Sequence, residues 1–200
     1  MLKRLMIPVL ALGVLLMVSA IPTQATVQPG PGPGWREVQA LAPGQTSADT
    51  TVRMNAADCQ RFLETRPDRT AADCVNHYSL KVVRSKTSAR SDNLVLASFA
   101  CGLSVESSMW NLVWWSYATV YFCWSPTYVY AWRVDCSNFG AYPGFSIAIT
   151  WCGAGAQGTY ADGGDNATIS AVTGGSYGAG IRIALDKWGN IWHYCWNAHC

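Results

Sequence analysis

The stretch after Asn93 is dominated by short segments rich in Val, Ile, Thr and aromatic residues, many of which alternate with polar residues at a period of two. This pattern is typical of half-buried β-strands. Clusters of Gly, Pro, Asn and Asp separate the segments, for example at 138–140, 143–144 and 162–165. The predicted strands are 94–101, 112–124, 127–135, 145–152, 166–173, 179–186 and 190–196. Because no helical stretches lie between them, we expect a mostly β fold, an antiparallel β-sandwich or small barrel of about seven strands.

A short helical lead is expected before this β region. Asn55 and Thr70 each precede an acidic residue by three positions, as helix N-cap residues do. Two helices are predicted, at about 56–65 and 71–77. If they form an antiparallel hairpin, Cys59 and Cys74 lie at opposite ends of it, so a direct bond between them is disfavoured. Residues 78–82 alternate as a further strand, and 84–91 form a polar, basic loop.

The N-terminus has the features of an export signal. Lys3 and Arg4 precede an uncharged apolar run, and small residues follow it, which predicts a cleaved signal peptide at 1–25 with cleavage after Ala25 or Ala20. The predicted location is therefore secreted and extracellular, with no membrane span after cleavage.

The rest of the chain divides by composition. Residues 26–52 contain a Pro/Gly repeat and few periodic apolar residues, which predicts a flexible lead-in. The helical segment and basic loop occupy 53–92, and the all-β domain occupies 93–200. We expect residues 53–200 to form one folded unit.

Charge is sparse and balanced. Only 13% of the residues are charged, and removing Lys3 and Arg4 with the signal leaves 12 basic residues against 12 acidic ones. Nucleic acids and anionic membranes are bound through an excess of Lys and Arg. The composition thus argues against nucleic acid as a partner.

All eight cysteines lie downstream of the signal, and an even number in an exported chain predicts a disulfide framework. Sequence cannot choose among the 105 possible pairings. The C-terminal group His193, Cys195, His199 and Cys200 has zinc-type ligands, but its spacing matches no zinc motif. No metal or other cofactor is expected there. The cysteines are Cys59, Cys74, Cys101, Cys123, Cys136, Cys152, Cys195 and Cys200.

Aromatic runs carry a resemblance. Three aromatic segments precede the terminal cysteine. They are residues 115–124, the Tyr-Val-Tyr-Ala-Trp of 128–132, which follows a proline turn, and the Trp-Gly-Asn-Ile-Trp of 188–192. In pattern, residues 95–200 resemble secreted, actinomycete-type small Trp/Cys-rich β proteins of unassigned function. The resemblance implies export and an all-β fold, and it implies no catalytic residue.

Two motifs point weakly to chemistry. Ser176 lies in a Gly-x-Ser-x-Gly sequence, with Asp186 and His193 following in the order of a hydrolase triad. The residues after Ser176 are typical of a glycine-rich strand rather than the required helix, so a secreted hydrolase is the third hypothesis and no catalytic residue is assigned. Asp162 and Asp165 are weak calcium candidates, because their turn lacks a closing acidic ligand.

The aromatic residues carry the leading hypothesis. In 190–196, the side chains of Trp192, Tyr194 and Trp196 share the face opposite to that of His193. In 112–124, Trp115 and Trp114 likewise lie on opposite faces. Exposed rings stack on sugars, whereas a helical lead folded over the face would bury them.

We therefore expect a non-enzymatic binding protein that recognises a carbohydrate or cell-envelope polymer, with Trp192, Tyr194 and Trp196 as the platform. The alternative is a secreted effector or inhibitor that acts on another protein.

Overall fold

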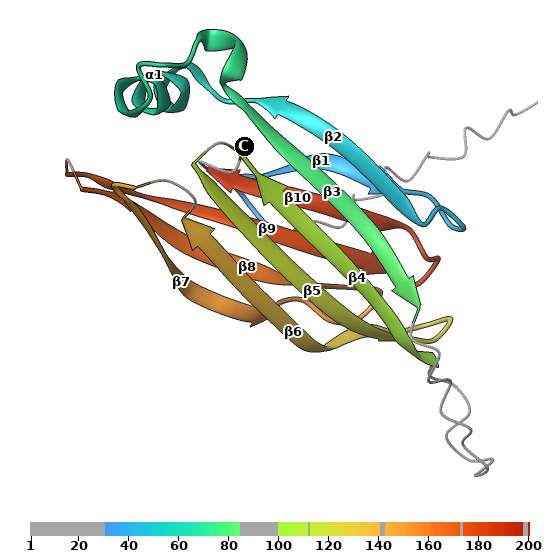
Figure 1. Cartoon of the computed structure of the whole chain (residues 1–200). Coiled ribbons are helices and arrows are strands. Elements are labelled where there is room, and N and C mark those ends of the chain that lie inside the picture. Colours follow the sequence, from blue (N-terminus) through green and yellow to red (C-terminus); the bar gives the residue numbers. More distant parts are fainter. Residues whose placement is uncertain (1–30, 85–99, 112, 141–142, 173, 198–199) are drawn as a thin grey trace, which may run out of the picture.

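The computed structural model describes residues 31–84, 100–111, 113–140, 143–172, 174–197 and 200, and it shows two antiparallel five-stranded sheets packed as an open sandwich (Figure 1). The predicted signal peptide at 1–25 lies outside the described residues. One helix, α1 (Ala56–Thr65), and a 3-10 turn, Ala71–Asp73, interrupt the strands. The strands are β1 (Trp35–Leu41), β2 (Ser47–Arg53), β3 (Val75–Arg84), β4 (Ala100–Trp110), β5 (Trp114–Trp124), β6 (Val129–Gly140), β7 (Phe145–Ala154), β8 (Tyr160–Ala171), β9 (Ser176–Asp186) and β10 (Ile191–Asn197).

Most strands pair with the strands that precede and follow them in the chain. Sheet A has the order β1-β10-β9-β8-β7, and sheet B has the order β2-β3-β4-β5-β6. Within each sheet, neighbours along the chain are also neighbours in the ladder, except that β1 pairs with β10. The chain therefore changes sheet only between β1 and β2 and between β6 and β7.

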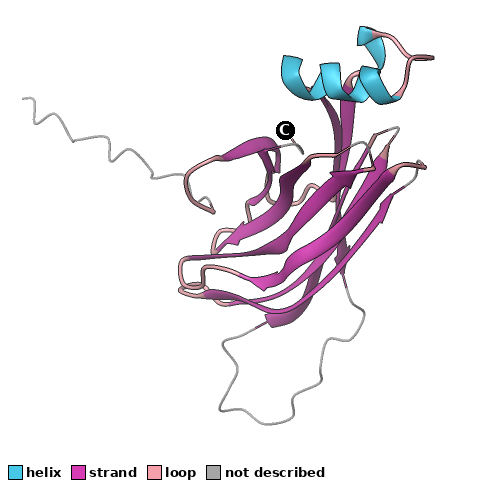
Figure 2. Ribbon diagram, turned by 90° about the vertical axis from the view of Figure 1, so that its left-hand side faces the viewer, coloured by secondary structure: helices cyan, strands magenta, loops and turns pink. Residues whose placement is uncertain are grey.

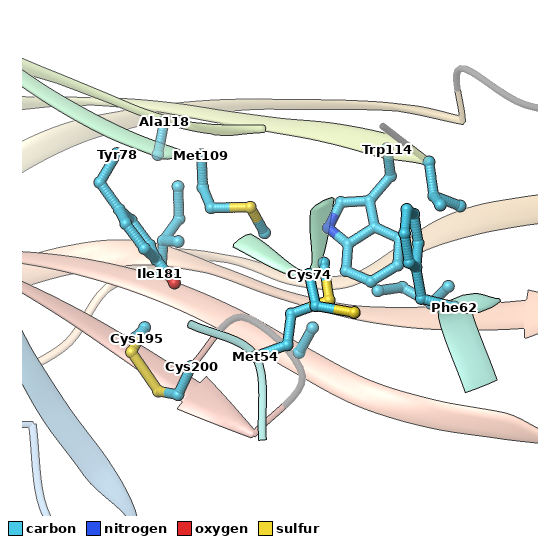
Figure 3. Close-up of a cluster of buried hydrophobic side chains, with 13 residues drawn as sticks. Met54, Phe62, Cys74, Tyr78, Met109, Trp114, Ala118, Ile181, Cys195 and Cys200 are labelled. Carbon is cyan, nitrogen blue, oxygen red and sulfur yellow. A yellow bond between two sulfur atoms is a disulfide. The ribbon is translucent and has the colours of Figure 1, made fainter. Parts of the chain in front are cut away.

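The core lies between the inner faces of the sheets, where period-two alternation places the apolar side chains. Near α1, Tyr78, Met109 and Trp114 from sheet B face Ile181 from sheet A, and Phe62 of α1 joins them (Figure 3). A second cluster, which includes Leu80, Phe122 and Ile183, fills the other part of the sandwich.

Both predicted helix caps are confirmed. The Asn55 side chain accepts a hydrogen bond from the Asp58 backbone N–H at 2.9 Å, and Thr70 and Asp73 form a reciprocal capping box. The helix is internal, however, because two strands precede it. It lies beyond one end of the sandwich, so it covers neither outer face (Figure 2). In the described part of the chain, no helix has the length and apolarity needed to cross a membrane.

The prediction of seven strands is wrong, since the described residues alone form ten. Strand β1 and most of β2 lie in residues 26–52, which were expected to be a flexible lead-in. A register shift between Glu37 and Gln39 interrupts the alternation in β1. Strand β2 is an edge strand whose inward positions are filled by small or β-branched residues such as Ala48 and Thr50. Neither strand therefore shows a strong hydrophobic period.

All eight cysteines are paired, and each bond joins cysteines that are consecutive in the chain. The disfavoured bond between Cys59 and Cys74 forms. The reason is that the second helix is only one 3-10 turn, so Cys74 begins the path into β3 instead of lying inside a helical hairpin. The pairs are Cys59–Cys74, Cys101–Cys123, Cys136–Cys152 and Cys195–Cys200.

Candidate functional site: an aromatic row on the outer face of sheet B

The platform expected on β10 is not an open surface. His193 and Cys195 point into the core, and Trp192, Tyr194 and Trp196 lie on the outer face of sheet A. The Tyr194 ring is only 4% exposed, and the two tryptophans are half-buried.

Side chains of the protein itself cover this outer face of sheet A. The Arg182 guanidinium lies between two rings, 5.1 Å from the centroid of Trp35 and 3.9 Å from that of Trp151. It also pairs with Asp162 at 3.5 Å. The Trp35 ring in turn lies 6.3 Å from that of Trp196. These cation–π contacts occupy the faces of the Trp35 and Trp151 rings, and they leave little ring surface for a ligand.

The calcium candidates do not form a cation site. Residues 162–165 belong to β8 instead of forming a turn, so Asp162 and Asp165 project from opposite faces of the sheet. Asp165 is fully buried between the sheets, where its carboxylate accepts hydrogen bonds from Ser116 Oγ at 3.1 Å and from Ile181 N–H at 3.2 Å. Burial raises the pKa of Asp165 to about 6. Across the described residues, no group of three or more His, Cys, Asp or Glu side chains is placed to hold a metal.

The residues of the hydrolase motif are far apart. Ser176 and Asp186 lie at opposite ends of β9, separated by about 33 Å of extended strand. The Asp186 carboxylate accepts hydrogen bonds from residues of its own turn, including Trp188 N–H at 2.9 Å. His193 is buried, its Nε2 lies 2.7 Å from Ser107 Oγ, and burial lowers its pKa to about 3. These three side chains therefore cannot act together.

Exposed rings gather instead on the outer face of sheet B. Four rings lie side by side on neighbouring strands, each the register partner of the next. They are His77 on β3, Trp110 on β4, Trp115 on β5 and Phe139 on β6. We call these four residues the aromatic row. Trp110, Trp115 and Phe139 are 38%, 50% and 60% exposed, and the His77 ring stacks on Trp110 at a centroid distance of 5.3 Å. The row crosses four adjacent strands.

The turn between β4 and β5 sets this register. Asn111 Oδ1 accepts hydrogen bonds from Val113 N–H at 2.8 Å and from Trp114 N–H at 3.0 Å, and its amide donates to Asn76 at 2.9 Å. These bonds fix a tight turn that places Trp110 directly opposite Trp115. Because strands are about 4.8 Å apart, the row is about 14 Å long between the outer backbones.

Hydroxyl groups follow the aromatic row along the strands. Two residues further along each strand, the outward positions are held by Ser79, Ser108, Tyr117 and Ser137. The next position on β5 is Thr119, whose hydroxyl lies 3.0 Å from that of Tyr117. The row therefore adjoins groups that can donate and accept hydrogen bonds.

Charges on this face balance. Lys81 and Glu106 are register partners, and Arg133 binds Asp135 through two contacts of 2.9 Å. Hydrogen bonding to Arg133 lowers the pKa of Asp135, which keeps the pair ionised. Among the described outward side chains of β2 to β6, three are basic and three are acidic: Arg53, Lys81 and Arg133 against Asp49, Glu106 and Asp135.

A cleft adjoins the His77 end of the row. It has a volume of about 210 Å³ and is lined by rings and polar groups, among them Arg69, Asp73, His77, Trp110 and Asn111.

At the far end of the same sheet, a bulge turns Trp132 outward, where it is 54% exposed and lies 5.5 Å from the Tyr121 ring.

The chain matches no family model, no curated protein and no solved structure.

Proposed function

We propose that this is a secreted, non-enzymatic binding protein that recognises a neutral carbohydrate or cell-envelope polymer through the aromatic row. The observation that carries the proposal is the register of His77, Trp110, Trp115 and Phe139, which aligns three exposed rings and the half-buried His77 ring on four successive strands. Contiguous exposed aromatic surface is uncommon on soluble proteins and marks binding sites.

The chemistry around the row favours sugar as the ligand. The face of a sugar ring that carries C–H groups packs on flat aromatic rings, and its hydroxyls need nearby hydrogen-bond partners. The hydroxyls of Ser108, Tyr117 and Ser137 lie in the adjoining register positions. Since the charges of this face balance, a neutral polymer fits better than a strongly charged one.

Export is supported by two features. The sequence predicts a signal peptide at 1–25, and the four disulfides are typical of an oxidising compartment. Both features are compatible with an extracellular protein, which would meet polysaccharides and cell envelopes.

Replacing Trp115 by alanine is expected to lower retention on polymer about tenfold, because the variant loses half-exposed ring surface at the centre of the row. The measurement is a pull-down of the purified, oxidised protein on chitin, cellulose, mannan and purified cell wall, with tryptophan fluorescence recorded alongside. Trp188→Ala is the matched control, since Trp188 is 67% exposed but lies in the turn after β9 of sheet A.

Equal loss in the Trp115 and Trp188 variants would remove the aromatic row as the binding surface. No retention of the wild-type protein on any of these polymers would overturn the proposal, and the hypothesis of a protein partner would take its place.

A further inference from the structure

We infer that the ligand is a single, twisted polysaccharide chain that crosses the strands of sheet B along the aromatic row, with one end in the cleft beside His77. This inference rests on the proposed function and adds the form, direction and length of the bound polymer.

The direction of the bound polysaccharide follows from the register of β3 to β6. The four rings lie on neighbouring strands at one level of the sheet, so the aromatic surface is continuous across the strands. Along β5, in contrast, the ring surface is interrupted after Tyr117, because the next outward position is Thr119, whose hydroxyl lies 3.0 Å from that of Tyr117. A polysaccharide chain that crosses the strands therefore contacts one ring on each strand, and it has hydroxyl groups along one side.

The form of the ligand follows from the twist of the sheet. Adjacent strands are rotated by about 20–25°, and the ribbons in Figure 1 twist visibly. Across the three steps from His77 to Phe139, the outward direction turns by about 60–75° around the axis of the row. A flat crystalline surface can touch only part of such a row, whereas one chain that turns about its own axis can follow all of it.

The length follows from the span of the row and its neighbouring cleft. The row is about 14 Å long, which corresponds to about three sugar units, since one unit of an extended chain is similar in length to the strand spacing. The cleft of about 210 Å³ is smaller than the sites that enclose drug-sized ligands, so it has room for one further unit. Arg69 and Asp73 in its lining offer partners for the hydroxyls of that unit.

The test measures affinities for cello- and chito-oligosaccharides, from the disaccharide to the hexasaccharide, by titration calorimetry on the oxidised protein. We expect affinity to rise at least tenfold from the disaccharide to the tetrasaccharide and then to level off. Trp115→Ala should abolish this rise. Trp132→Ala should retain it, because Trp132 lies on the same sheet about 20 Å away along the strands. Swollen, amorphous cellulose should retain more protein than crystalline cellulose.

Three results would overturn the inference while leaving the proposed function intact. These are affinity independent of chain length, loss of the rise in the Trp132 variant, and stronger retention on the crystalline polymer. If the wild-type protein binds none of these sugars and no polymer in the pull-down, the proposed function fails as well, so the two failures are distinguishable.

Discussion

Replacing Gly164 by alanine is expected to lower the free energy of unfolding by about 3 kcal/mol and the melting temperature by about 10 °C. Gly164 lies on β8 of sheet A, between β7 and β9, at a point where β9 approaches β8 closely. A Cβ atom there would collide with the carbonyl oxygen of Ile181 and would lie 2.9 Å from Arg182 Cα. Because both atoms belong to the backbone, no rotamer change can relieve the collision. Thermal and denaturant unfolding of the oxidised protein measure the effect.

Gly153→Ala provides the matched control. Gly153 is the register partner of Gly164 on β7, and the atoms nearest to its added Cβ belong to the Trp151 side chain, at 3.2 Å. A side chain can shift by a few tenths of an ångström, so this variant should remain within about 0.5 kcal/mol of the wild type. Equal destabilisation of the two variants would show that the close approach of β8 and β9 is not the cause.

Asp165→Asn is expected to remove a pH-dependent loss of stability. Burial raises the pKa of Asp165 from its ordinary value of 3.8 to about 6 in the folded protein. Between about pH 4 and pH 6, the folded state therefore holds a proton that the unfolded state releases, and stability falls as pH rises. This rise in the pKa of Asp165 corresponds to about 3 kcal/mol of stability, which is fully present below about pH 4 and lost above about pH 6.

Asparagine preserves the local hydrogen bonds. Its carbonyl oxygen can accept from Ile181 N–H, and its amide can donate to Ser116 Oγ, in place of the carboxylate. The difference in free energy of unfolding between the variant and the wild type should increase, in favour of the variant, by about 3 kcal/mol from pH 4 to pH 7. Urea unfolding at a series of pH values measures it. A difference that does not change over this range would contradict the prediction.

Asp68→Asn tests whether a carboxylate with a lowered pKa changes the pH dependence of stability in the opposite direction to Asp165. Asp68 is an exposed residue whose pKa is lowered to about 2 by its hydrogen bond to Arg66. Its ionised form favours the folded state, so wild-type stability from this group is lost as pH falls through the range from about 4 to 2. The two aspartate variants should therefore change the pH profile in opposite directions and in different windows.

Most of the sheet framework could be predicted because it depends on local alternation. The strands β5 to β10 follow from period-two patterns in a sequence rich in β-branched and aromatic residues. The predicted strand at 94–101 overlaps β4 only at residues 100 and 101, and its residues 94–99 lie outside the described part of the chain. The pattern predicts no strand over the rest of β4, because serines occupy several of its positions, including the buried Ser107. The Asp-Gly-Gly-Asp sequence of β8 looked like a turn. Instead, Gly163 leaves space for Val120 and Val134 in the core, and Gly164 permits the close approach of β9.

The candidate site could be predicted only in part. The sequence indicated that Trp115 and Trp114 occupy opposite faces, and the structure places Trp115 outward and Trp114 in the core. The aromatic row also requires Trp110 and Phe139, which come from strands whose mutual register no local pattern reveals. The burial of Tyr194 likewise depends on tertiary neighbours, which alternation alone does not show.

The order of the disulfides has a consequence for biosynthesis. The bonds join the cysteines in chain order, the first with the second, the third with the fourth and so on, over separations of 15, 22, 16 and 5 residues. Suppose that the chain enters an oxidising compartment N-terminus first. The first, third, fifth and seventh cysteines each then meet their native partner as the next cysteine to emerge. Oxidation in order of translocation therefore yields the native bonds directly, and the protein should mature in a host that lacks a disulfide isomerase.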